Sequence, residues 1–223
     1  MSLWGRNSER LAQTAEMARA AGAKVSQRCC DMRETEAAIA ALLSEDSSAP
    51  FDCAYLVAGL GDIRADADLV EDPALVMRLA EVNFAAPAAM AAAMAGRMAE
   101  RGQGRIVLIG SAAGHHSLPF AAAYSGSKAG LARYADALRL SVKPHGVSVT
   151  LAAPGFIDTP AARAISGQRP LEMPVEVAAL RIAKAALAGK RYHVTPWPFR
   201  VLRVVDALLP AAVRDRVLGS LKP

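Results

Sequence analysis

The feature that most limits the fold is the alternation of short apolar runs with helix-forming segments along almost the whole chain. The runs at 53–59, 105–111 and 147–155 are apolar nearly throughout, rather than at every second residue. Such runs are typical of parallel strands that helices cover on both faces. Because helical patterns separate them, the sequence predicts an α/β fold with a doubly wound parallel sheet.

The elements follow one another without a repeat or a polar linker, which predicts one α/β domain over 1–195 and an amphipathic helical tail of the same domain over 196–223. Strands are expected over 3–5, 24–30, 53–59, 105–111, 147–155 and 192–196. Helices are expected over 8–21, 33–46, 73–98, 119–142 and 174–188 and in the tail, with a short irregular stretch after 155.

Composition and charge exclude several classes of protein. Hydrophobic residues make up 53% of the 223 residues and aromatics only 5%, so the core is expected to be aliphatic and disorder is excluded. The net charge is +5, and residues 190–223 carry all of it, with seven basic and two acidic side chains. A neutral body with a basic tail does not fit a nucleic-acid-binding surface.

The three cysteines are odd in number and lie in or beside apolar runs, which favours reduced thiols and a cytoplasmic protein. No metal-ligand spacing accompanies them, so no metal site is expected. The apolar run at 84–96 is shorter than the roughly 20 residues that span a bilayer.

Three polar residues provide a chemical hypothesis. Tyr124 and Lys128 stand four apart on a predicted helix, so they share one face of it. A nearby ammonium lowers the pKa of a phenol, which lets the phenol exchange a proton with an alcohol or carbonyl oxygen. Ser111 ends the preceding strand, at the sheet edge where such folds bind ligands. The alternative is that Tyr124 and Lys128 only pack, as most such pairs do.

Further motifs favour the chemical hypothesis. GRIVLIGSAAG, YSGSKAG, VNF, LAAPGFIDTP and CCDM occur in this order along the chain. Together they resemble the short-chain dehydrogenases/reductases, which implies a Rossmann-type fold and a nicotinamide-dependent oxidoreductase acting on a small-molecule carbonyl or alcohol. The resemblance implies catalytic roles for Asn83, Ser111, Tyr124 and Lys128. It implies cofactor contacts by Asp31, Met32, Ala58, Gly59, Tyr124, Lys128, Pro154, Gly155, Ile157 and Thr159.

Arg6 bears on the choice of cofactor. In NAD enzymes of this type an acidic residue at the end of the second strand binds the ribose 2′-hydroxyl, whereas this chain has Gly5 followed by Arg6. An arginine pairs with a 2′-phosphate through charge-assisted hydrogen bonds. The sequence therefore favours NADP over NAD. The alternative is a solvated arginine at the entry to a helix.

The resemblance also predicts an N-terminal truncation, since only four residues precede Gly5. The family's first strand and its glycine-rich turn, which binds the diphosphate, would lie before this point. Three explanations stay open: a misassigned or shortened start, another segment or subunit in the vacant place, or a protein that folds poorly and binds no dinucleotide. A non-catalytic or inactive dehydrogenase-like protein is therefore the alternative function.

The remaining interpretations concern surfaces. His115 and His116 follow the catalytic strand and are expected to face solvent rather than the substrate. In the tail, Arg200, Arg203 and Asp206 share one stripe of a helix whose other side is apolar. This helix packs on its own domain or a partner subunit, or it lies on an anionic membrane surface. The resemblance implies a homo-oligomer, with the helix over 74–98 and the Tyr124 helix as candidate contacts.

Overall fold

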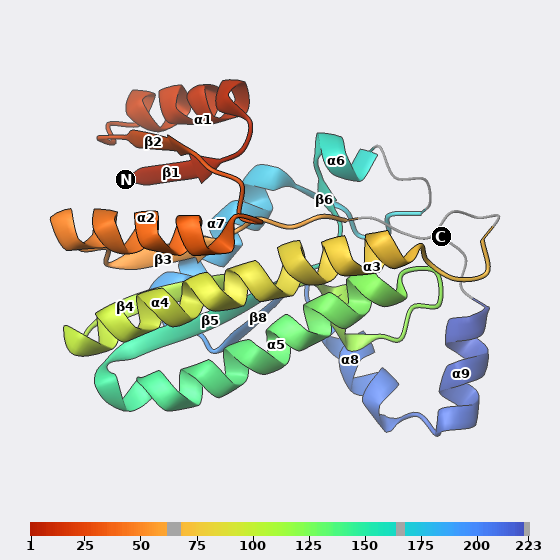
Figure 1. Ribbon diagram of the computed structural model, residues 1–223. Coiled ribbons are helices and arrows are strands. Elements are labelled where there is room, and N and C mark those ends of the chain that lie inside the picture. Colours follow the sequence, from red (N-terminus) through yellow and green to blue (C-terminus); the bar gives the residue numbers. More distant parts are fainter. Residues whose placement is uncertain (62–67, 164–167, 221–223) are drawn as a thin grey trace. The chain divides into compact units, whose positions relative to one another are not determined.

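The computed structural model describes residues 1–61, 68–163 and 168–220 (Figure 1). The chain forms two compact units, residues 1–49 and residues 50–223, and each is described by itself. Both units contain parallel strands connected by helices, so the predicted α/β class is confirmed. The predicted division into a domain over 1–195 and a tail over 196–223 stays a prediction.

The first unit is a β–α–β–α segment. Its elements are β1 (Ser2–Gly5), α1 (Ser8–Ala20), β2 (Ser26–Cys29) and α2 (Thr35–Ser48). Strands β1 and β2 pair in parallel from Ser2↔Ser26 to Gly5↔Cys29. The Asn7 side chain accepts a hydrogen bond from the Arg10 N–H at 2.9 Å, which caps α1 as asparagine caps commonly do. Both strands therefore end at the same edge, where Arg6 and Cys30 follow them.

The second unit is built on a four-stranded sheet in which every neighbouring pair is parallel. Its strands are β3 (Cys53–Leu56), β4 (Gly104–Ile109), β5 (Val147–Pro154) and β8 (Tyr192–Thr195), in the spatial order β3-β4-β5-β8. Because the strands are parallel, their carboxyl ends meet at one edge, and the segments that follow β3, β4 and β5 contain the predicted catalytic and cofactor residues.

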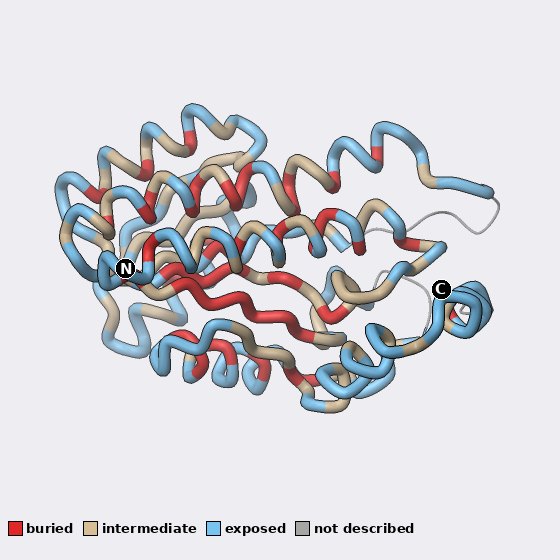
Figure 2. The backbone as a smooth tube through the Cα atoms, turned by 90° about the horizontal axis from the view of Figure 1, so that it is seen from below, coloured by how far each residue is buried: buried red, intermediate tan, exposed pale blue. Residues whose placement is uncertain are grey.

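Helices cover this sheet on both faces. Alternate residues of β4 and β5 point to opposite sides, so Val107 and Ala152 pack with Ile182 and Ala186 of α7 (Val175–Leu187). On the other side lie α4 (Ala86–Glu100) and α5 (Ala122–Val142), which contact β4 and β5. Figure 2 shows the two central strands as the most continuously buried part of the chain.

One long helical stretch runs through α3 (Pro73–Ala80), a π-helical turn η1 (Glu81–Ala85) and α4. By length and composition alone, the stretch Pro73–Glu100 would suffice to cross a membrane, although 44% of its most apolar window is buried inside the protein. Its contacts with β4 and α5 are those of a core helix.

The short elements were the hardest to predict. The stretch after Thr159, expected to be irregular, contains α6 (Pro160–Arg163), and the two-residue strands β6 (Ile157–Asp158) and β7 (Met173–Pro174) pair in parallel. Two residues are too few to show a period. Helix α5 begins at Ala122 rather than at 119, and a 3-10 helix η2 (Ala112–His115) precedes it. Two more helices, α8 (Pro198–Leu208) and α9 (Ala211–Gly219), end the described chain.

The three cysteines are free, as predicted, but they are less buried than expected. Cys29 is exposed, and Cys30 and Cys53 are half-buried. Because three of the four residues of β2 are exposed, Cys29 among them, its cysteine does not reach a core.

Candidate active site

Ser111 lies just beyond the carboxyl end of β4. The Gly110 N–H donates to the Ala152 carbonyl at 2.7 Å and so extends the ladder between β4 and β5 by one residue. The Ser111 hydroxyl oxygen then accepts a hydrogen bond from the Ala113 N–H at 3.1 Å and caps η2. Serine is a preferred cap because its side chain satisfies a free backbone donor at a helix start. The hydroxyl is therefore held at the predicted edge of the sheet.

Helix α5 brings Tyr124 to Ser111. Tyr124 lies in the first turn of α5, and the Ser111 side chain interacts with its phenol and lowers the pKa of the phenol. Lys128 follows one turn later on the same helix, and it is only 5% exposed. A side chain at position 114 is excluded because its Cβ would lie 2.9 Å from the Lys128 carbonyl carbon, so Gly114 lets η2 pack directly on the backbone of α5.

The start of α5 is held by a residue that the sequence did not point to. The N-cap residue, Ala121, has no side chain that can accept a hydrogen bond. Instead both carboxylate oxygens of Glu71 accept from the Ala123 N–H, at 3.1 and 2.8 Å. A carboxylate also interacts favourably with the positive end of a helix. Glu71 is 52 residues from Ala123 in the chain, so only the missing local cap hinted at an outside partner.

Glu71→Ala is expected to lower the free energy of unfolding by about 1 kcal/mol, because a typical helix cap contributes that much. It is also expected to reduce turnover, since Ala123 is the neighbour of Tyr124. Urea unfolding measures the first effect, and Glu100→Ala is the matched control because Glu100 lies in an exposed pair with Arg97 at 3.3 Å. Equal stability of both variants would contradict the capping role.

Lys128 lies in a site that penalises its charge. Its ammonium nitrogen donates to the Ile109 carbonyl at 2.9 Å, at the end of β4. Burial lowers the pKa of Lys128 from 10.5 to about 8, because the surroundings solvate the charged form less well than water does. At neutral pH the side chain is therefore mostly an ammonium, held by its hydrogen bond to the Ile109 carbonyl.

The pKa of Tyr124 departs from the expectation. Burial raises it above the usual value of 10, and the hydrogen bond with Ser111 offsets part of that increase. The predicted lowering by Lys128 is not found here, since the ammonium is bonded to the Ile109 carbonyl and does not act on the phenol. In this structure Tyr124 is consequently a neutral phenol at physiological pH, the form that donates a proton.

Asn83 lies where the long helix is distorted. It belongs to the π-helical turn η1, a feature often found at functional sites, and its side chain is fully buried. Its amide oxygen accepts from the Leu60 N–H at 2.7 Å, and its amide nitrogen donates to the Leu60 carbonyl at 2.9 Å and to the Ser127 hydroxyl at 3.3 Å. Asn83 thus joins the segment after β3 to helix α5. Its predicted role in holding a water stays a prediction.

The segment after β3 comes close to this cluster at Gly59. A Cβ at Gly59 would lie 3.2 Å from both the Asn83 amide oxygen and the Lys128 ammonium nitrogen. Because Gly59 has no side chain, its backbone can lie close to the Asn83 amide and the Lys128 ammonium, where a larger residue would be crowded. The neighbouring Ala58 is exposed. The structure brings Gly59, Asn83 and Lys128 together, and the contact of Ala58 and Gly59 with the cofactor stays a prediction.

The segment after β5 ends at the same edge as Ser111. Pro154 closes the strand, and the Gly155 N–H donates to the Thr195 carbonyl at 2.8 Å. Ile157 lies in β6, and the Thr159 hydroxyl oxygen accepts from the Ala162 N–H at 3.1 Å. The ring of Phe199 from α8 lies against Gly155, where a Cβ would approach it to 2.3 Å. Helix α8 therefore reaches the segment that is expected to line the nicotinamide.

The remaining predicted cofactor residues lie in the first unit. Arg6 is exposed just after β1, and Asp31 and Met32 follow β2. Arg33 binds Asp31 through its side chain, at 2.7 Å for the closest pair of atoms, and through its backbone N–H at 3.0 Å. These bonds lower the pKa of Asp31 to about 2, with a smaller contribution from Arg6. Arg6 and Asp31 are thus electrostatic neighbours at one sheet edge.

The expectation of solvent-facing histidines is wrong. Both are half-buried against the C-terminal segment. His115 Nε2 is hydrogen-bonded to the Tyr192 hydroxyl, and burial together with the nearby Arg203 lowers the pKa of His115 to about 4. His116 Nδ1 lies 3.4 Å from the carboxylate of Asp206 in α8. Folding brings β8 and α8 over these histidines, which no local pattern revealed.

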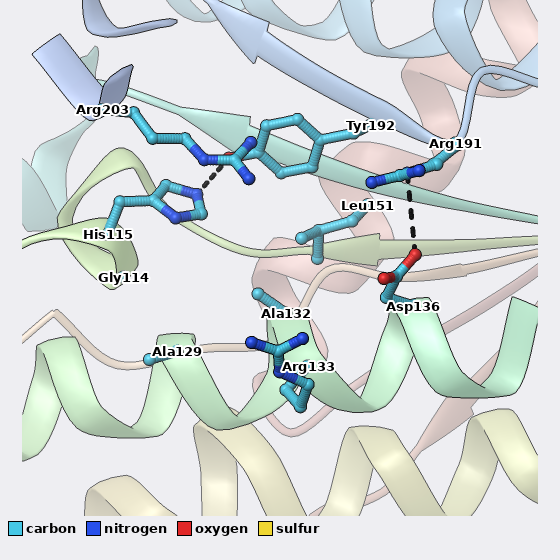
Figure 3. Close-up of a pocket in the computed structure, with 10 residues that line it drawn as sticks. All are labelled: Gly114, His115, Ala129, Ala132, Arg133, Asp136, Leu151, Arg191, Tyr192 and Arg203. Carbon is cyan, nitrogen blue, oxygen red and sulfur yellow. Dashed lines mark hydrogen bonds and ion pairs between the residues drawn. The ribbon is translucent and has the colours of Figure 1, made fainter. Parts of the chain in front are cut away.

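Two cavities flank the segment 114–119. The larger, about 570 Å³, is lined by residues 114–119 and the first two turns of α5 (Ala122, Ser125, Gly126 and Ala129). The smaller, about 220 Å³, lies between α5, β5, β8 and α8 (Figure 3). Its walls include His115, Tyr192 and Arg203. Among the described residues, Ser111, Tyr124 and Lys128 line neither of these two cavities.

In the ranges 1–61, 68–163 and 168–220, no three side chains of the metal-binding types His, Cys, Asp and Glu are grouped to hold an ion. The polar groups that do converge are a serine hydroxyl, a phenol, an amide and an ammonium, and their chemistry is proton transfer and hydrogen bonding.

Comparison with known proteins places this geometry in context. The family model described as short chain dehydrogenase matches residues 1–170. An uncharacterized oxidoreductase of Mycobacterium tuberculosis is 32% identical over 225 residues, which cover 97% of this chain and 87% of that protein. Ketoacyl reductase HetN of Nostoc is 33% identical over 156 residues, which cover 68% of this chain and 53% of the reductase, so the match spans about half of that relative.

Two solved structures show similar folds. A short-chain dehydrogenase from Sphingobium yanoikuyae in complex with NADPH has a TM-score of 0.79 at 24% identity, over 99% of this chain and 86% of that one. A gluconate 5-dehydrogenase from Burkholderia cenocepacia in complex with NADP and tartrate has a TM-score of 0.65 at 26% identity, over 73% of this chain and 64% of that one. The likeness extends over a Rossmann-like α/β fold.

Proposed function

Because this chain belongs to the short chain dehydrogenase family, a family of oxidoreductases, we propose that it is an NADP-dependent enzyme. It transfers hydride between nicotinamide and a carbonyl or secondary alcohol of a small or lipid-like substrate. The observation that carries the proposal is that the Ser111 side chain interacts with the Tyr124 phenol, one helical turn from the buried Lys128. The matched residues 1–170 include every residue proposed for the site.

Each of the two units, taken by itself, has residues suited to one part of a dinucleotide. Gly59 leaves open a space beside the Lys128 ammonium and the Asn83 amide that a Cβ would fill, so a ribose hydroxyl can approach them. In the first unit, Arg6 is exposed where a strand ends and no acidic side chain occupies the preceding position, Gly5. The gluconate 5-dehydrogenase that resembles this chain was solved with NADP, which supports the same choice.

The roles of the side chains follow from their protonation. When bound, the nicotinamide ring supplies or accepts the hydride. In the direction of carbonyl reduction, Tyr124 donates its phenolic proton to the carbonyl oxygen as the carbon gains the hydride, and a secondary alcohol results. The Ser111 hydroxyl donates a hydrogen bond to the same oxygen. The Lys128 ammonium, held one turn away, is positioned to bind a ribose hydroxyl.

The choice of cofactor is tested by titrating the protein with NADPH and with NADH and measuring both affinities by calorimetry. Arg6→Ala is expected to weaken NADPH binding about tenfold or more, because a charge-assisted pair with the 2′-phosphate is lost, and to leave NADH binding unchanged. Arg10→Ala, an exposed arginine of α1, is the matched control. Equal affinity for NADPH in both variants would remove Arg6 from the site, and no binding of either dinucleotide would favour the non-catalytic alternative.

Assembly and location remain proposals. A homo-oligomer is supported by exposed apolar side chains on the predicted contact helices, with Met77 of α3 71% exposed and Leu140 of α5 61% exposed. Sedimentation velocity measures the mass directly. The cytoplasmic location stays a prediction.

A further inference from the structure

Helix α8 is turned opposite to the usual orientation of an amphipathic helix. Its inward side chains are Phe199, Arg203 and Asp206, spaced i, i+4 and i+7. Its outward side carries Val201, Val204, Val205 and Leu208, with Leu202 at the margin. The exposed fractions of these five residues range from 46% to 79%. A surface helix ordinarily buries its apolar stripe and exposes its charges.

Specific contacts hold this orientation. Phe199 packs on Gly155 and lies 6.4 Å from the ring of Phe156. The Arg203 guanidinium lies over the Tyr192 ring at 4.6 Å, and Figure 3 shows it reaching inward beside His115. The Asp206 carboxylate meets His116 at 3.4 Å. Because these partners lie on three separate segments, rotating α8 to bury its valines would break all three contacts.

The apolar side is therefore left uncovered by the residues that the structure describes. Figure 2 shows the C-terminal helices as largely exposed. Helix α9 continues the pattern, with Val213 47% and Val217 49% exposed, and Trp197 at the start of α8 is 72% exposed. An exposed apolar surface rimmed by polar groups is typical of an interaction site.

The charges around this surface identify its occupant. Arg200 and Arg216 are exposed, and Arg214 is partly exposed beside Asp215. The side chains of Arg203 and Asp206 point inward, so the charged side chains that face solvent on α8 and α9 have a positive net charge. The whole segment 190–223 carries the net charge of +5. A second copy of the chain would present the same positive charge and repel it, whereas an anionic lipid surface is complementary.

We propose that α8 and α9 form a docking surface for an anionic membrane, into which Val204, Val205 and Leu208 insert at headgroup depth. Trp197 lies at one end, as aromatic side chains do at membrane interfaces. Basic residues combined with an apolar face are the features of helices that lie in the plane of a bilayer. This surface is independent of hydride transfer, so its test needs neither cofactor nor turnover.

The test is co-sedimentation of the full chain with vesicles of phosphatidylcholine containing about 30 mol% phosphatidylglycerol, and with phosphatidylcholine alone. We expect binding at least tenfold stronger to the anionic vesicles, and a fall in that preference at about 0.5 M salt. Leu208→Asp is expected to weaken binding about tenfold or more, since it places a charge in the apolar face. Arg200→Gln with Arg216→Gln is expected to reduce the preference for anionic lipid.

The matched control is Leu187→Asp. Leu187 ends α7 as Leu208 ends α8, and the two are similarly exposed, at 69% and 79%. In a Trp4→Phe background, the Trp197 fluorescence is expected to shift to shorter wavelength on adding anionic vesicles, and to stay unshifted in Leu208→Asp. Equal loss of binding in both leucine variants, or no binding by the unmodified chain, would overturn the proposal. So would an oligomer that Leu208→Asp dissociates without any effect of vesicles.

Discussion

Tyr124→Phe is expected to reduce kcat for reduction of a ketone probe by at least about 10³-fold, because it removes the only phenolic proton held beside Ser111. The ring and its packing are kept, so the affinity for NADPH should not change. Turnover is followed by loss of NADPH absorbance with a panel of small ketones and β-keto esters, and affinity by calorimetry.

Tyr134→Phe is the matched control for this result. Tyr134 lies on the same helix, and its hydroxyl donates to the Ala88 carbonyl at 2.9 Å. Removing that hydroxyl should cost stability of about 1 kcal/mol and leave turnover intact. A Tyr124→Phe enzyme that keeps its activity would disprove the role of the phenol. An unmodified chain that binds NADPH yet reduces no ketone would favour the non-catalytic alternative.

The second large effect concerns pH and the buried lysine. The pKa of Lys128 falls from 10.5 in the unfolded chain to about 8 in the folded protein. Between these two pH values the unfolded chain binds more protons, so the free energy of unfolding rises with pH across this window. The gain is about 3 kcal/mol, since each unit of pKa difference is worth roughly 1.4 kcal/mol. Below pH 8 the buried ammonium is the costly form.

Lys128→Met should therefore change how the free energy of unfolding depends on pH, and not only its value at one pH. The methionine keeps most of the buried stem but cannot ionise, so the variant lacks the rise between about pH 8 and pH 10.5. Urea unfolding at pH 7, 9 and 11 measures this, and Lys184→Met, at an exposed site on α7, controls for the loss of a lysine. Parallel profiles for Lys128→Met and the unmodified chain would show that the ammonium is better solvated than its 5% exposure implies.

The pKa shifts of Tyr124 and Lys128 also indicate a direction for the proposed chemistry. Burial raises the pKa of Tyr124, so the phenol stays protonated at neutral pH and is suited to donate to a carbonyl oxygen. Oxidation of an alcohol needs the phenolate and should therefore be favoured at higher pH. The pKa shifts therefore distinguish the role of Tyr124 from that of Lys128, which their spacing of four residues in the sequence did not do.

The parts of the fold that the sequence predicted are those with a strong local pattern. The buried strands β4 and β5 are continuous apolar runs, and both were found within two residues of the expected ends. Helix α5 was expected three residues too early, because its start depends on Glu71 and not on a neighbouring cap. The β6–β7 pair escaped prediction because each strand has two residues.

The sequence alone determined the parallel α/β class, the edge at which Ser111 lies and the pairing of Tyr124 with Lys128 on one helix, because residue period and local spacing carry that information. Only the tertiary structure decided what surrounds these groups. It buried Lys128 against the Ile109 carbonyl, brought β8 and α8 over the two histidines, and turned Arg203 and Asp206 of α8 inward. Such contacts join residues 19 to roughly 90 positions apart, and their energies depend on burial and partners that no local pattern specifies.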